Sequence, residues 1–351
     1  MSLGILHNIL IAVLLFSLSI YLMIFAYKYR EENRYGFNST ILVVVFLIIL
    51  GVSILLFENL IPYPINGAIS VWLGVVFAAQ GVYFLVMKYR YKEEGNKANI
   101  DDDSYAENGE LKLKKEYMRK SFHLVVLLIV ICYFFLALII NDLVYRIYLN
   151  DPQLYYSIWS ISDYPYVPST ANDLQVMASW TFMFFVSATI FLIIPDIFRI
   201  YNRKYSMFSG VYKMVIRKKE LYSLGPQIYL TISCTFVFLL SILGFIEPLV
   251  ALAGMMIAGF ADAAAAIIGR KYGTHKFKTV VQKDEEKSYE GLLAGFLVAY
   301  IVALIFVGPI VAIFGALTFS IIDYLNPKLA DNVLNPILCS FAMLIPFILI
   351  G

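Results

Sequence analysis

The sequence predicts an all-α polytopic membrane protein with about ten transmembrane helices, both termini outside and the basic loops in the cytoplasm. Three observations predict this class. Of the 351 residues, 61% are hydrophobic and only 15% are charged, a balance typical of proteins that lie within a bilayer. Apolar runs of spanning length follow one another along the chain. Lysine and arginine gather in alternate connections between those runs, which sets the orientation.

Ten apolar runs define the predicted helices. The first has no basic segment before it and is too long for a cleavable signal sequence, so it is expected to span. The Gly308-Pro309 pair separates the eighth run from the ninth. The ninth and tenth are short enough to be tilted or partly re-entrant. The runs are residues 5–27, 39–57, 66–88, 121–141, 176–196, 223–243, 247–268, 290–308, 310–325 and 334–350.

The basic residues set the predicted orientation. Cytoplasmic loops of membrane proteins carry an excess of lysine and arginine. The connections at 58–65, 142–175 and 244–246 contain only Arg146. Ten spans then place both termini outside. All the other lysines and arginines fall in residues 28–34, 88–120, 197–221 and 269–289, or at Lys328.

Three connections have a composition that predicts their structure. Residues 89–119 are polar and predict a flexible tether. Residues 142–175 are rich in Tyr, Trp, Pro and Ser and predict an ordered interfacial cap. Residues 197–221 predict an amphipathic helix on the inner leaflet, or only the basic bias of a cytoplasmic loop. Asn38-Ser39-Thr40 matches the glycosylation pattern, but the predicted orientation puts it in the cytoplasm.

One acidic residue stands inside the seventh apolar run. Asp262 is the only charged residue between Glu247 and Arg270. It precedes Gly269 by seven residues, which is two helical turns or roughly 10 Å. A carboxylate in hydrocarbon is expensive, so such residues face a bundle interior or a wet cavity. Asp262 is therefore a candidate ligand for Mg²⁺, which prefers one or two carboxylates together with phosphate oxygens.

The connection that follows Asp262 predicts an anion site. Gly269 and Gly273 let the backbone come close to a ligand. The next helix is expected to start near Ser288, where its free N–H groups favour an anion. The cations of this connection are Arg270, Lys271, Lys276 and Lys287.

Two polar clusters fall at other predicted cytoplasmic helix ends. Arg119 and His123 are four residues apart and share a helix face, so they either hold phosphate oxygens or simply end the helix. Asp196 and Arg199 are three residues apart. They either join the site or pair with each other.

A last polar pair precedes the tenth run. Asp331-Asn332 is by default a helix cap. By the predicted orientation it lies on the same side as the basic connection, so it can also complete a metal site.

Five motifs of this chain occur together: Arg119-Lys120-x-x-His123, Pro195-Asp196-x-x-Arg199, Asp262 seven residues before Gly269-Arg270-Lys271-Tyr272-Gly273, Lys287-Ser288-x-Glu290-Gly291 and Asp331-Asn332-x-x-x-Pro336. In this combination the chain resembles the CTP-dependent polyprenol kinase family, which includes dolichol kinases, phytol kinases and CTP-dependent diacylglycerol kinases. The resemblance is to dolichol kinases above all and covers roughly residues 115–345.

The resemblance implies a division of the chain and two departures from the family pattern. Residues 1–114 are then a three-helix accessory part with a polar loop, and residues 115–351 are the kinase domain. Ala261 and Ala263 flank Asp262 where the family usually has glycine. Asp323 stands where the family often has glutamate.

The resemblance also implies a reaction. The γ-phosphoryl group of CTP is transferred, with Mg²⁺ or another divalent cation, to the hydroxyl of a long isoprenoid alcohol in the bilayer. The active site would lie on the cytoplasmic face of a prokaryotic plasma membrane or of the endoplasmic reticulum. Membrane lipids are further expected partners, whereas nucleic acid is not expected to bind. Whether the protein forms a homodimer is left open.

The same resemblance assigns roles to residues. Asp262 and Asp331 would bind the metal, with Asp196 as a further catalytic candidate. Asp262 or His123 would accept the proton of the alcohol. The residues expected to hold the nucleotide are Arg119, Lys120, Arg199, Gly269, Arg270, Lys271, Gly273, Lys276, Lys287, Ser288, Glu290, Gly291 and Asn332.

Other functions stay open at this stage. Within the same family, the acceptor could be phytol, geranylgeraniol or a diacylglycerol. A CTP:phosphatidate cytidylyltransferase uses the same nucleotide, but that family usually carries a His-Gly-Gly run, and this sequence has none. A secondary transporter would predict discontinuous helices at mid-bilayer, whereas the polar residues here gather at one surface.

Overall fold

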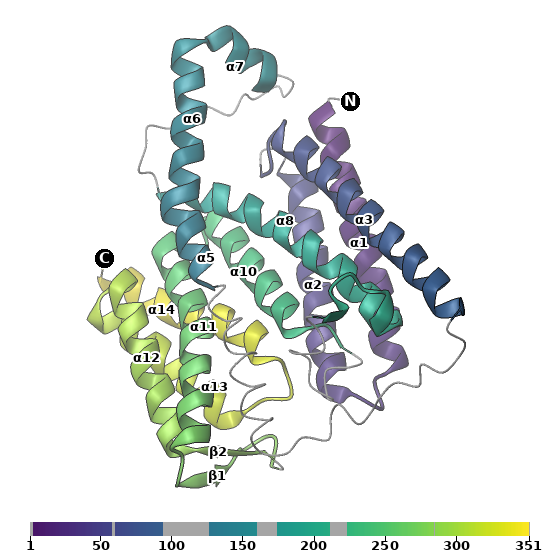
Figure 1. The fold of residues 1–351 in the computed structure, drawn as a ribbon. Coiled ribbons are helices and arrows are strands. Elements are labelled where there is room, and N and C mark those ends of the chain that lie inside the picture. The colour runs from purple at the N-terminus through teal and green to yellow at the C-terminus, as the bar shows by residue number, and fades with distance from the viewer. Residues whose placement is uncertain are drawn as a thin grey trace.

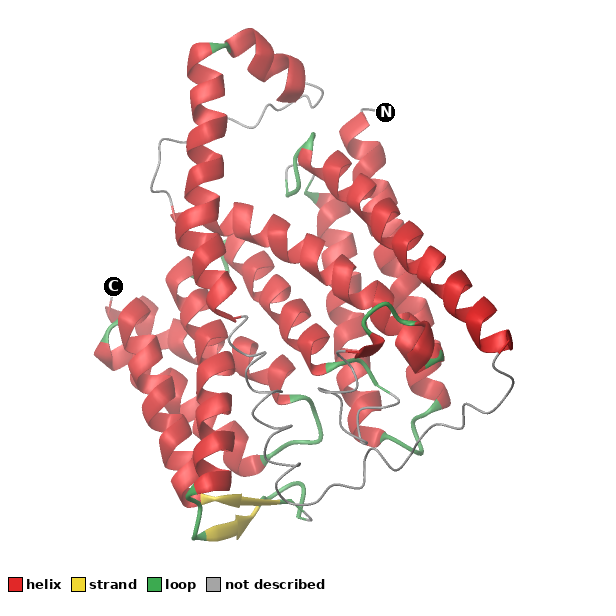
Figure 2. Ribbon diagram, in the orientation of Figure 1, coloured by secondary structure: helices red, strands yellow, loops and turns green. Residues whose placement is uncertain are grey.

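The computed structural model describes residues 3–57, 60–93, 126–159, 174–210, 223–283 and 285–350. In these segments the chain is helical apart from short connections and one two-stranded hairpin (Figure 2). The helices are α1 (Leu3–Lys28), α2 (Arg34–Leu56), α3 (Ile65–Glu93), α5 (Val126–Ile131), the π-helical η4 (Cys132–Leu136), α6 (Ala137–Asn150), α7 (Pro152–Trp159), α8 (Leu174–Tyr201), the 3₁₀ turn η5 (Arg203–Tyr205), α10 (Pro226–Ile242), α11 (Pro248–Lys271), α12 (Tyr289–Val307), α13 (Pro309–Leu325) and α14 (Asp331–Ile350). The hairpin consists of β1 (Lys276–Lys278) and β2 (Glu286–Ser288).

Eight helices in the described segments are long and apolar enough to cross a membrane, by length and composition. Two shorter apolar helices, α10 and α13, complete the set. These ten helices correspond to the ten apolar runs, so the predicted all-α membrane class is confirmed. Large apolar side chains on their outer faces are exposed, as a surface in contact with lipid requires. The chain is therefore an integral membrane protein.

Glycine and proline mark several helix boundaries. Gly308 lies between α12 and α13 with a φ of 76°, in the left-handed region that glycine tolerates. Pro309 follows as the first residue of α13, and Pro226 and Pro248 open α10 and α11 in the same way. Proline fits this position because its missing N–H would have no helical partner there. The ninth apolar run is thus a complete helix.

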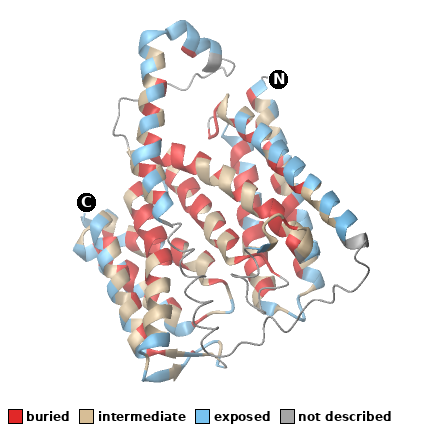
Figure 3. Ribbon diagram, in the orientation of Figure 1, coloured by how far each residue is buried: buried red, intermediate tan, exposed pale blue. Residues whose placement is uncertain are grey.

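Helix α11 lies at the centre of the C-terminal half. It packs against α12, α14, α10 and α13, and its first half is almost entirely buried (Figure 3). Small residues let transmembrane helices approach closely. A Cβ on Gly254, for example, would lie 2.8 Å from the carbonyl oxygen of Pro336 on α14. The first half of α11 therefore packs directly against the first turns of α14.

The N-terminal helices share one hydrophobic core with the others. Helix α1 packs against α2 and α3, while α2 contacts α10 and α3 contacts α8. Buried side chains form one continuous cluster that runs from α1 to α14. Residues 3–93 therefore pack on the remaining helices and are not held at a distance from them.

The basic connections lie at one end of the helices (Figure 1). The turn between α1 and α2, the ends of α3 and α8 and the hairpin lie toward that end, and the N-terminus lies at the other. Within the described segments, Arg146 on α6 is the one lysine or arginine at the opposite end. The basic connections of the described segments thus lie toward the same end of the helices, and their orientation in the membrane stays a prediction.

Two connections differ from expectation. Helix α8 extends to Tyr201, and Arg199 is buried in it, so the expected surface helix over 197–221 does not begin at 197. The remaining lysines and arginines after residue 210 in that segment lie outside the described residues. In the expected cap at 142–175, α6 continues to Asn150 and α7 follows. There the rings of Tyr148 and Tyr155 pack with centroids 5.1 Å apart.

Candidate functional site

Lys287 is the centre of the candidate site. Its ammonium Nζ lies 2.7 Å from Oδ1 of Asp323, and it also donates to the backbone carbonyl of Asp323 at 3.1 Å. The two side chains are only 24% and 13% exposed. Salt screens a partly buried pair less than a surface pair, so this contact holds Lys287 in place more firmly than an exposed ion pair would.

Three carboxylates act on the Lys287 ammonium. Burial alone lowers the pKa of Lys287, but the charges of Asp331, Asp323 and Asp262 together raise the pKa above its ordinary value. Asp323 is the one of the three with a hydrogen bond to Lys287 described above, and the charges of Asp331 and Asp262 act on the same cation through space. The three carboxylates come from α11, α13 and α14, helices whose ends meet beside the hairpin (Figure 1).

The hairpin carries Lys287 to these helix ends. Its strands pair antiparallel, and Phe277 stands opposite Lys287. The ring of Phe277 packs against Tyr289 at 4.8 Å and Tyr324 at 5.3 Å between centroids. Cross-strand neighbours share a face of the sheet, so the face with Phe277 and Lys287 is the one that meets α13.

Asn326 joins the loop of the hairpin to the end of α13 by hydrogen bonds. Its φ of 48° is left-handed, a conformation that asparagine tolerates. Its side-chain amide donates to Oγ1 of Thr279 at 3.3 Å and to a carboxylate oxygen of Glu285 at 3.0 Å. Its carbonyl accepts from Nε2 of Gln282 at 3.2 Å. The loop between the two strands is therefore fixed to the end of α13, three residues after Asp323.

Asp262 lies half-buried on α11, two turns before Gly269. The helix continues to Lys271, as expected from the apolar pattern. The charge of Asp262 is one of those that raise the pKa of Lys287, so the two residues interact electrostatically. Their expected sharing of one ligand stays a prediction.

Gly269, Gly273 and Gly291 lie where α11 and α12 come closest. A Cβ on Gly291 would lie 2.7 Å from the carbonyl oxygen of Ala265 and 2.9 Å from Cα of Gly269. A Cβ on Gly273 would collide with the carbonyl of Gly269 and the hydroxyl of Ser288. In the structure, the missing side chains of the three glycines make room for neighbouring chain atoms. The expected approach of a ligand to the backbone of Gly269 and Gly273 stays a prediction.

Ser288 caps the N-terminus of α12. Its hydroxyl accepts the N–H of Gly291 at 3.2 Å and donates to the carbonyl of Gly269 at 3.4 Å. Serine is a favoured residue at this position because it satisfies one of the free N–H groups of the first turn. The expected helix start near Ser288 is confirmed, and its hydroxyl joins α12 to α11.

Glu290 fixes the turn that leads into β1. Its Oε1 accepts from Oγ1 and N–H of Thr274 at 2.7 and 3.1 Å, and from N–H of His275 at 3.0 Å. It also lies 2.7 Å from Nδ1 of His275. This carboxylate therefore orders the backbone between α11 and the hairpin. Its expected contact with a nucleotide stays a prediction.

Asp331 opens α14 at the site. Ala330 is the cap residue, because its carbonyl accepts the N–H groups of Val333 and Leu334 at 2.9 and 3.2 Å. The default interpretation of Asp331-Asn332 as the cap is therefore one residue off. A carboxylate in the first turn of a helix is stabilised by the helix dipole. Asn332 donates to the carbonyl of Pro226 at 3.1 Å, which joins α14 to α10.

Asp196 and Arg199 pair with each other, one of the two interpretations of their spacing. Arg199 Nε and Nη2 donate to the two carboxylate oxygens of Asp196, and both residues are buried. Arg199 also donates to the carbonyl of Ser223, and Asp196 accepts the N–H of Gly225 at 2.9 Å. The pair joins the end of α8 to the start of α10. Its expected catalytic and nucleotide-binding roles stay predictions.

Asn335 lies one turn deeper on α14 than Asp331 and faces the same way, since residues four apart share a helix face. Its side chain is 3% exposed, and within the described segments its Oδ1 has no hydrogen-bond partner. A buried acceptor left in this state costs about 1–3 kcal/mol. An unpartnered acceptor inside a membrane-spanning helix makes Asn335 a further candidate residue of the site.

Three further cations surround this end of α11. All are exposed, and one of them, Lys276, donates to the carbonyl of Gly269 at 3.3 Å. Exposed cations close to a shielded ion pair can attract a polyanion without being fixed in place. They are Arg270, Lys271 and Lys276. The other predicted cluster, Arg119, Lys120 and His123, lies outside the described residues.

The donors available to a metal are few. In the segments that the structure describes, no group of three or more His, Cys, Asp or Glu side chains is arranged to hold a metal ion. Asp262 and Asp331 alone do not form a closed cage. They fit Mg²⁺, however, which is commonly held by one or two carboxylates with substrate phosphates and water as its other ligands.

One residue of this site was noted in the sequence without a definite role, and another was not noted. Asp323 was seen as an acid at the end of the ninth run, where the family pattern often has glutamate, but its contact with Lys287 was not predicted. Asn335 was not singled out at all. Its signal is a carboxamide four residues after Asp331 in an otherwise apolar helix.

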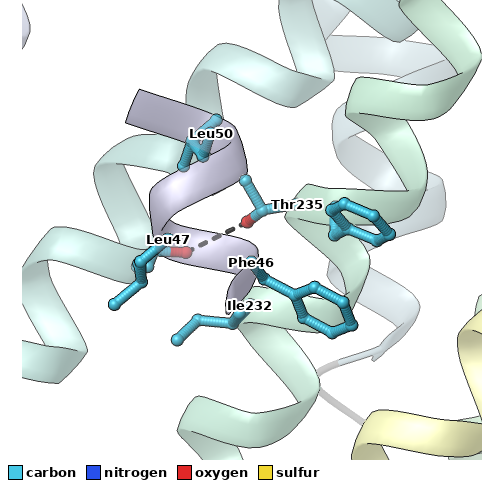
Figure 4. A pocket seen from close by; sticks show the side chains of 7 residues that line it. Phe46, Leu47, Leu50, Ile232 and Thr235 are labelled. Atoms are coloured by element: carbon cyan, nitrogen blue, oxygen red, sulfur yellow. Dashed lines mark hydrogen bonds between the residues drawn. The ribbon is translucent and has the colours of Figure 1, made fainter. Parts of the chain in front are cut away.

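A small apolar pocket lies deeper in the bundle, between α2, α8 and α10 (Figure 4). Thr189 and Thr235 hydrogen-bond at 3.0 Å across it, and the rings of Phe46 and Phe236 stack with centroids 4.2 Å apart. Its lining has no charged residue, so it offers no catalytic group. The lining residues are Phe46, Leu47, Leu50, Thr189, Ile232, Thr235 and Phe236.

Comparison of the chain with known protein families, with curated proteins and with solved structures finds no match. The fold and composition define the class: an α-helical integral membrane protein with eight candidate spans in the described segments. Within that class, the particular activity rests on the residues of the site.

Proposed function

We propose that the protein is a membrane lipid kinase that transfers the γ-phosphoryl group of CTP to the hydroxyl of a long isoprenoid alcohol of the dolichol type. The supporting observation is the convergence of Asp262, Asp323 and Asp331 on the Lys287 ammonium at the basic end of the helices. Phosphoryl transfer needs positioned charge more than covalent chemistry. A partly buried cation among carboxylates at a helix end supplies such charge.

The position of the site suits a substrate that cannot leave the bilayer. Asp262 and Asn335 lie inside membrane-spanning helices, whereas Lys287 lies on the hairpin beyond them. An alcohol would approach from the lipid side and a nucleotide from the water side. The two reactants would then meet at the ends of α11, α12 and α14.

The reaction forms one bond and breaks one. The alcohol oxygen attacks the γ-phosphorus, the bond from that phosphorus to the β–γ bridging oxygen breaks, and CDP leaves. The proton of the alcohol passes to a carboxylate or imidazole, for which Asp262 and His123 are the two candidates. Mg²⁺, when bound by Asp262 and Asp331, would neutralise charge on the phosphoryl oxygens.

The residues of this chain have distinct parts in that scheme. Lys287 would exchange its contact with Asp323 for a phosphoryl oxygen, and Arg270 and Lys276 would draw the triphosphate to the helix ends. Asn335 would accept a hydrogen bond from the alcohol hydroxyl. Asp323 would keep the Lys287 ammonium in place when no nucleotide is bound.

An acceptor panel tests the proposal. Purified protein is incubated with CTP labelled in the γ-phosphoryl group and, in turn, with a polyprenol, phytol, geranylgeraniol, diacylglycerol or phosphatidate. ATP is the donor control. We expect labelled polyprenyl phosphate and CDP. Formation of a CDP-lipid and pyrophosphate from phosphatidate would identify a cytidylyltransferase instead, and solute uptake into vesicles without CTP turnover would identify a transporter.

A further inference from the structure

The segment Asn38-Ser39-Thr40, at the start of α2, contacts the C-terminal helices at three places. Asn38 donates to the carbonyl of Lys328 at 3.2 Å. The hydroxyl of Ser39 accepts the N–H of Ala330 at 2.9 Å. The hydroxyl of Thr40 lies 3.3 Å from that of Tyr229 on α10. The sequence pattern that suggested glycosylation thus belongs to an internal contact.

The hydroxyl of Ser39 both donates and accepts a hydrogen bond. It donates to the carbonyl of Tyr35 one turn earlier at 2.8 Å, which leaves an oxygen lone pair for the N–H of Ala330. Ser39 is completely buried and Ala330 is 2% exposed. Without this bond the Ala330 N–H would be a buried donor without a partner, a situation that native proteins avoid.

Ala330 is the cap residue of α14 and immediately precedes Asp331. Alanine has no side chain with which to cap a helix. The hydroxyl of Ser39 on α2 therefore fixes the backbone at the point where α14 begins. The direction in which the side chain of Asp331 points away from α14 depends on the position of that backbone.

The same part of α2 also supports the start of α10. A Cβ on Gly36 would lie 2.6 Å from Cβ of Ser223, so α2 approaches this residue closely. Ser223 offers its carbonyl to Arg199, and Gly225 offers its N–H to Asp196. One helix of the N-terminal part therefore holds two segments that border the site.

We propose that α2 is a positioning element of the phosphoryl-transfer site, and that Ser39 acts by fixing Ala330 so that Asp331 is held toward the metal and Lys287. This inference rests on the proposed function. It gives α2 a role in the site beyond that of an accessory membrane helix.

Replacement of Ser39 by Ala tests this role. The variant loses the acceptor for the Ala330 N–H and keeps the helix. We expect the Mg²⁺ concentration for half-maximal CTP turnover to rise about threefold to tenfold, which is the effect of one hydrogen bond. Ser39→Thr keeps the hydroxyl and should restore most of the affinity. A general loss of folded protein would lower the rate at every Mg²⁺ concentration without moving this midpoint.

Ser19→Ala is the matched control. Ser19 is also buried and donates to the carbonyl four residues earlier, Leu15, at 2.8 Å, as Ser39 does to Tyr35. In the described segments it accepts no N–H from another helix. The control should leave the Mg²⁺ midpoint unchanged.

A second readout does not depend on activity. Hydrogen exchange of the peptide that contains Ala330 should be faster in Ser39→Ala than in the wild type and in Ser19→Ala. Unchanged exchange, or faster exchange with an unmoved Mg²⁺ midpoint in an active enzyme, would overturn the inference and leave the kinase proposal standing. If the wild type transfers no phosphoryl group from CTP, the kinase proposal fails, and the positioning role proposed for phosphoryl transfer fails with it. The exchange result then decides only the Ser39–Ala330 contact.

Discussion

The acidic residues that interact with Lys287 are far from it in the sequence. Its partner Asp323 lies 36 residues later, and Asp262 lies 25 residues earlier. The raised pKa keeps the ammonium protonated to a higher pH than that of a free lysine. A pH dependence of turnover between about pH 6 and 9 would therefore arise from another group, since this lysine stays charged throughout.

The part of the site that the sequence predicted is the part with a local signal. Asp262 and Asp331 are acids at unusual places in or beside apolar runs, and Lys287 precedes a helix start, so each could be found alone. The pairing of Lys287 with Asp323 has no local signal, because the two residues lie 36 positions apart in the sequence. Only the packing of α12 against α13 and the hydrogen bonds of Asn326 bring them together.

Asn335 supports a prediction at the scale of one side chain. Leucine has nearly the same shape as asparagine and carries no polar atom, so Asn335→Leu removes an unsatisfied acceptor. Such a change can be neutral or stabilising for folding. We expect an unchanged or higher melting temperature, a KM for the alcohol raised about threefold to tenfold, and an unchanged KM for CTP.

Either of two results would contradict the role of Asn335 in binding the alcohol. A large loss of stability would mean that Asn335 serves the packing of α14, and an unchanged KM for the alcohol would remove it from the acceptor site. Melting curves and initial rates with each substrate varied in turn distinguish these cases.

At the scale of elements, the contact between α11 and α12 depends on glycine. Gly291→Ala would place a Cβ 2.7 Å from the carbonyl oxygen of Ala265, so the helices must move apart. Overpacking of this kind typically costs about 1–3 kcal/mol. Because the hairpin connects these two helices, we expect turnover of CTP to fall as well as thermal stability.

Gly74→Ala is the control for that variant. Gly74 lies inside α3, and a Cβ there would meet nothing within 4 Å. Alanine favours a helix over glycine by roughly 0.5–1 kcal/mol, so stability should be unchanged or slightly higher. Equal effects at both positions, measured by thermal unfolding in the same detergent, would contradict the packing account.

The elements themselves were largely readable from the sequence. Hydrophobic length identifies spanning helices because the bilayer allows few other structures, and Gly308-Pro309 divided the eighth run from the ninth correctly. The hairpin was not expected, since three-residue strands leave little pattern. The extension of α8 over Arg199 was not expected either, because its charge finds a buried partner in Asp196 only after folding.

At the scale of the whole molecule, the basic end predicts an orientation in the membrane. Single cysteines are placed at Lys278 in the hairpin and at Phe245, which is 63% exposed in the connection between α10 and α11, after replacement of Cys132, Cys234 and Cys339. In intact cells, an impermeant maleimide should modify Phe245→Cys from outside. It should reach Lys278→Cys only after the membrane is opened, and the reverse pattern would contradict the orientation.

The most direct test of the central claim is the initial rate of γ-phosphoryl transfer from CTP to a polyprenol, compared between the wild type and Asp262→Asn. The claim is that this intramembrane carboxylate and Lys287 share one triphosphate site. We predict polyprenyl phosphate and CDP from the wild type. For a variant that retains the wild-type melting temperature, we predict a rate lower by about a hundredfold or more, as for other losses of charge stabilisation at an active site. A wild type that yields no phosphorylated lipid, or a variant as fast as the wild type, would contradict the claim.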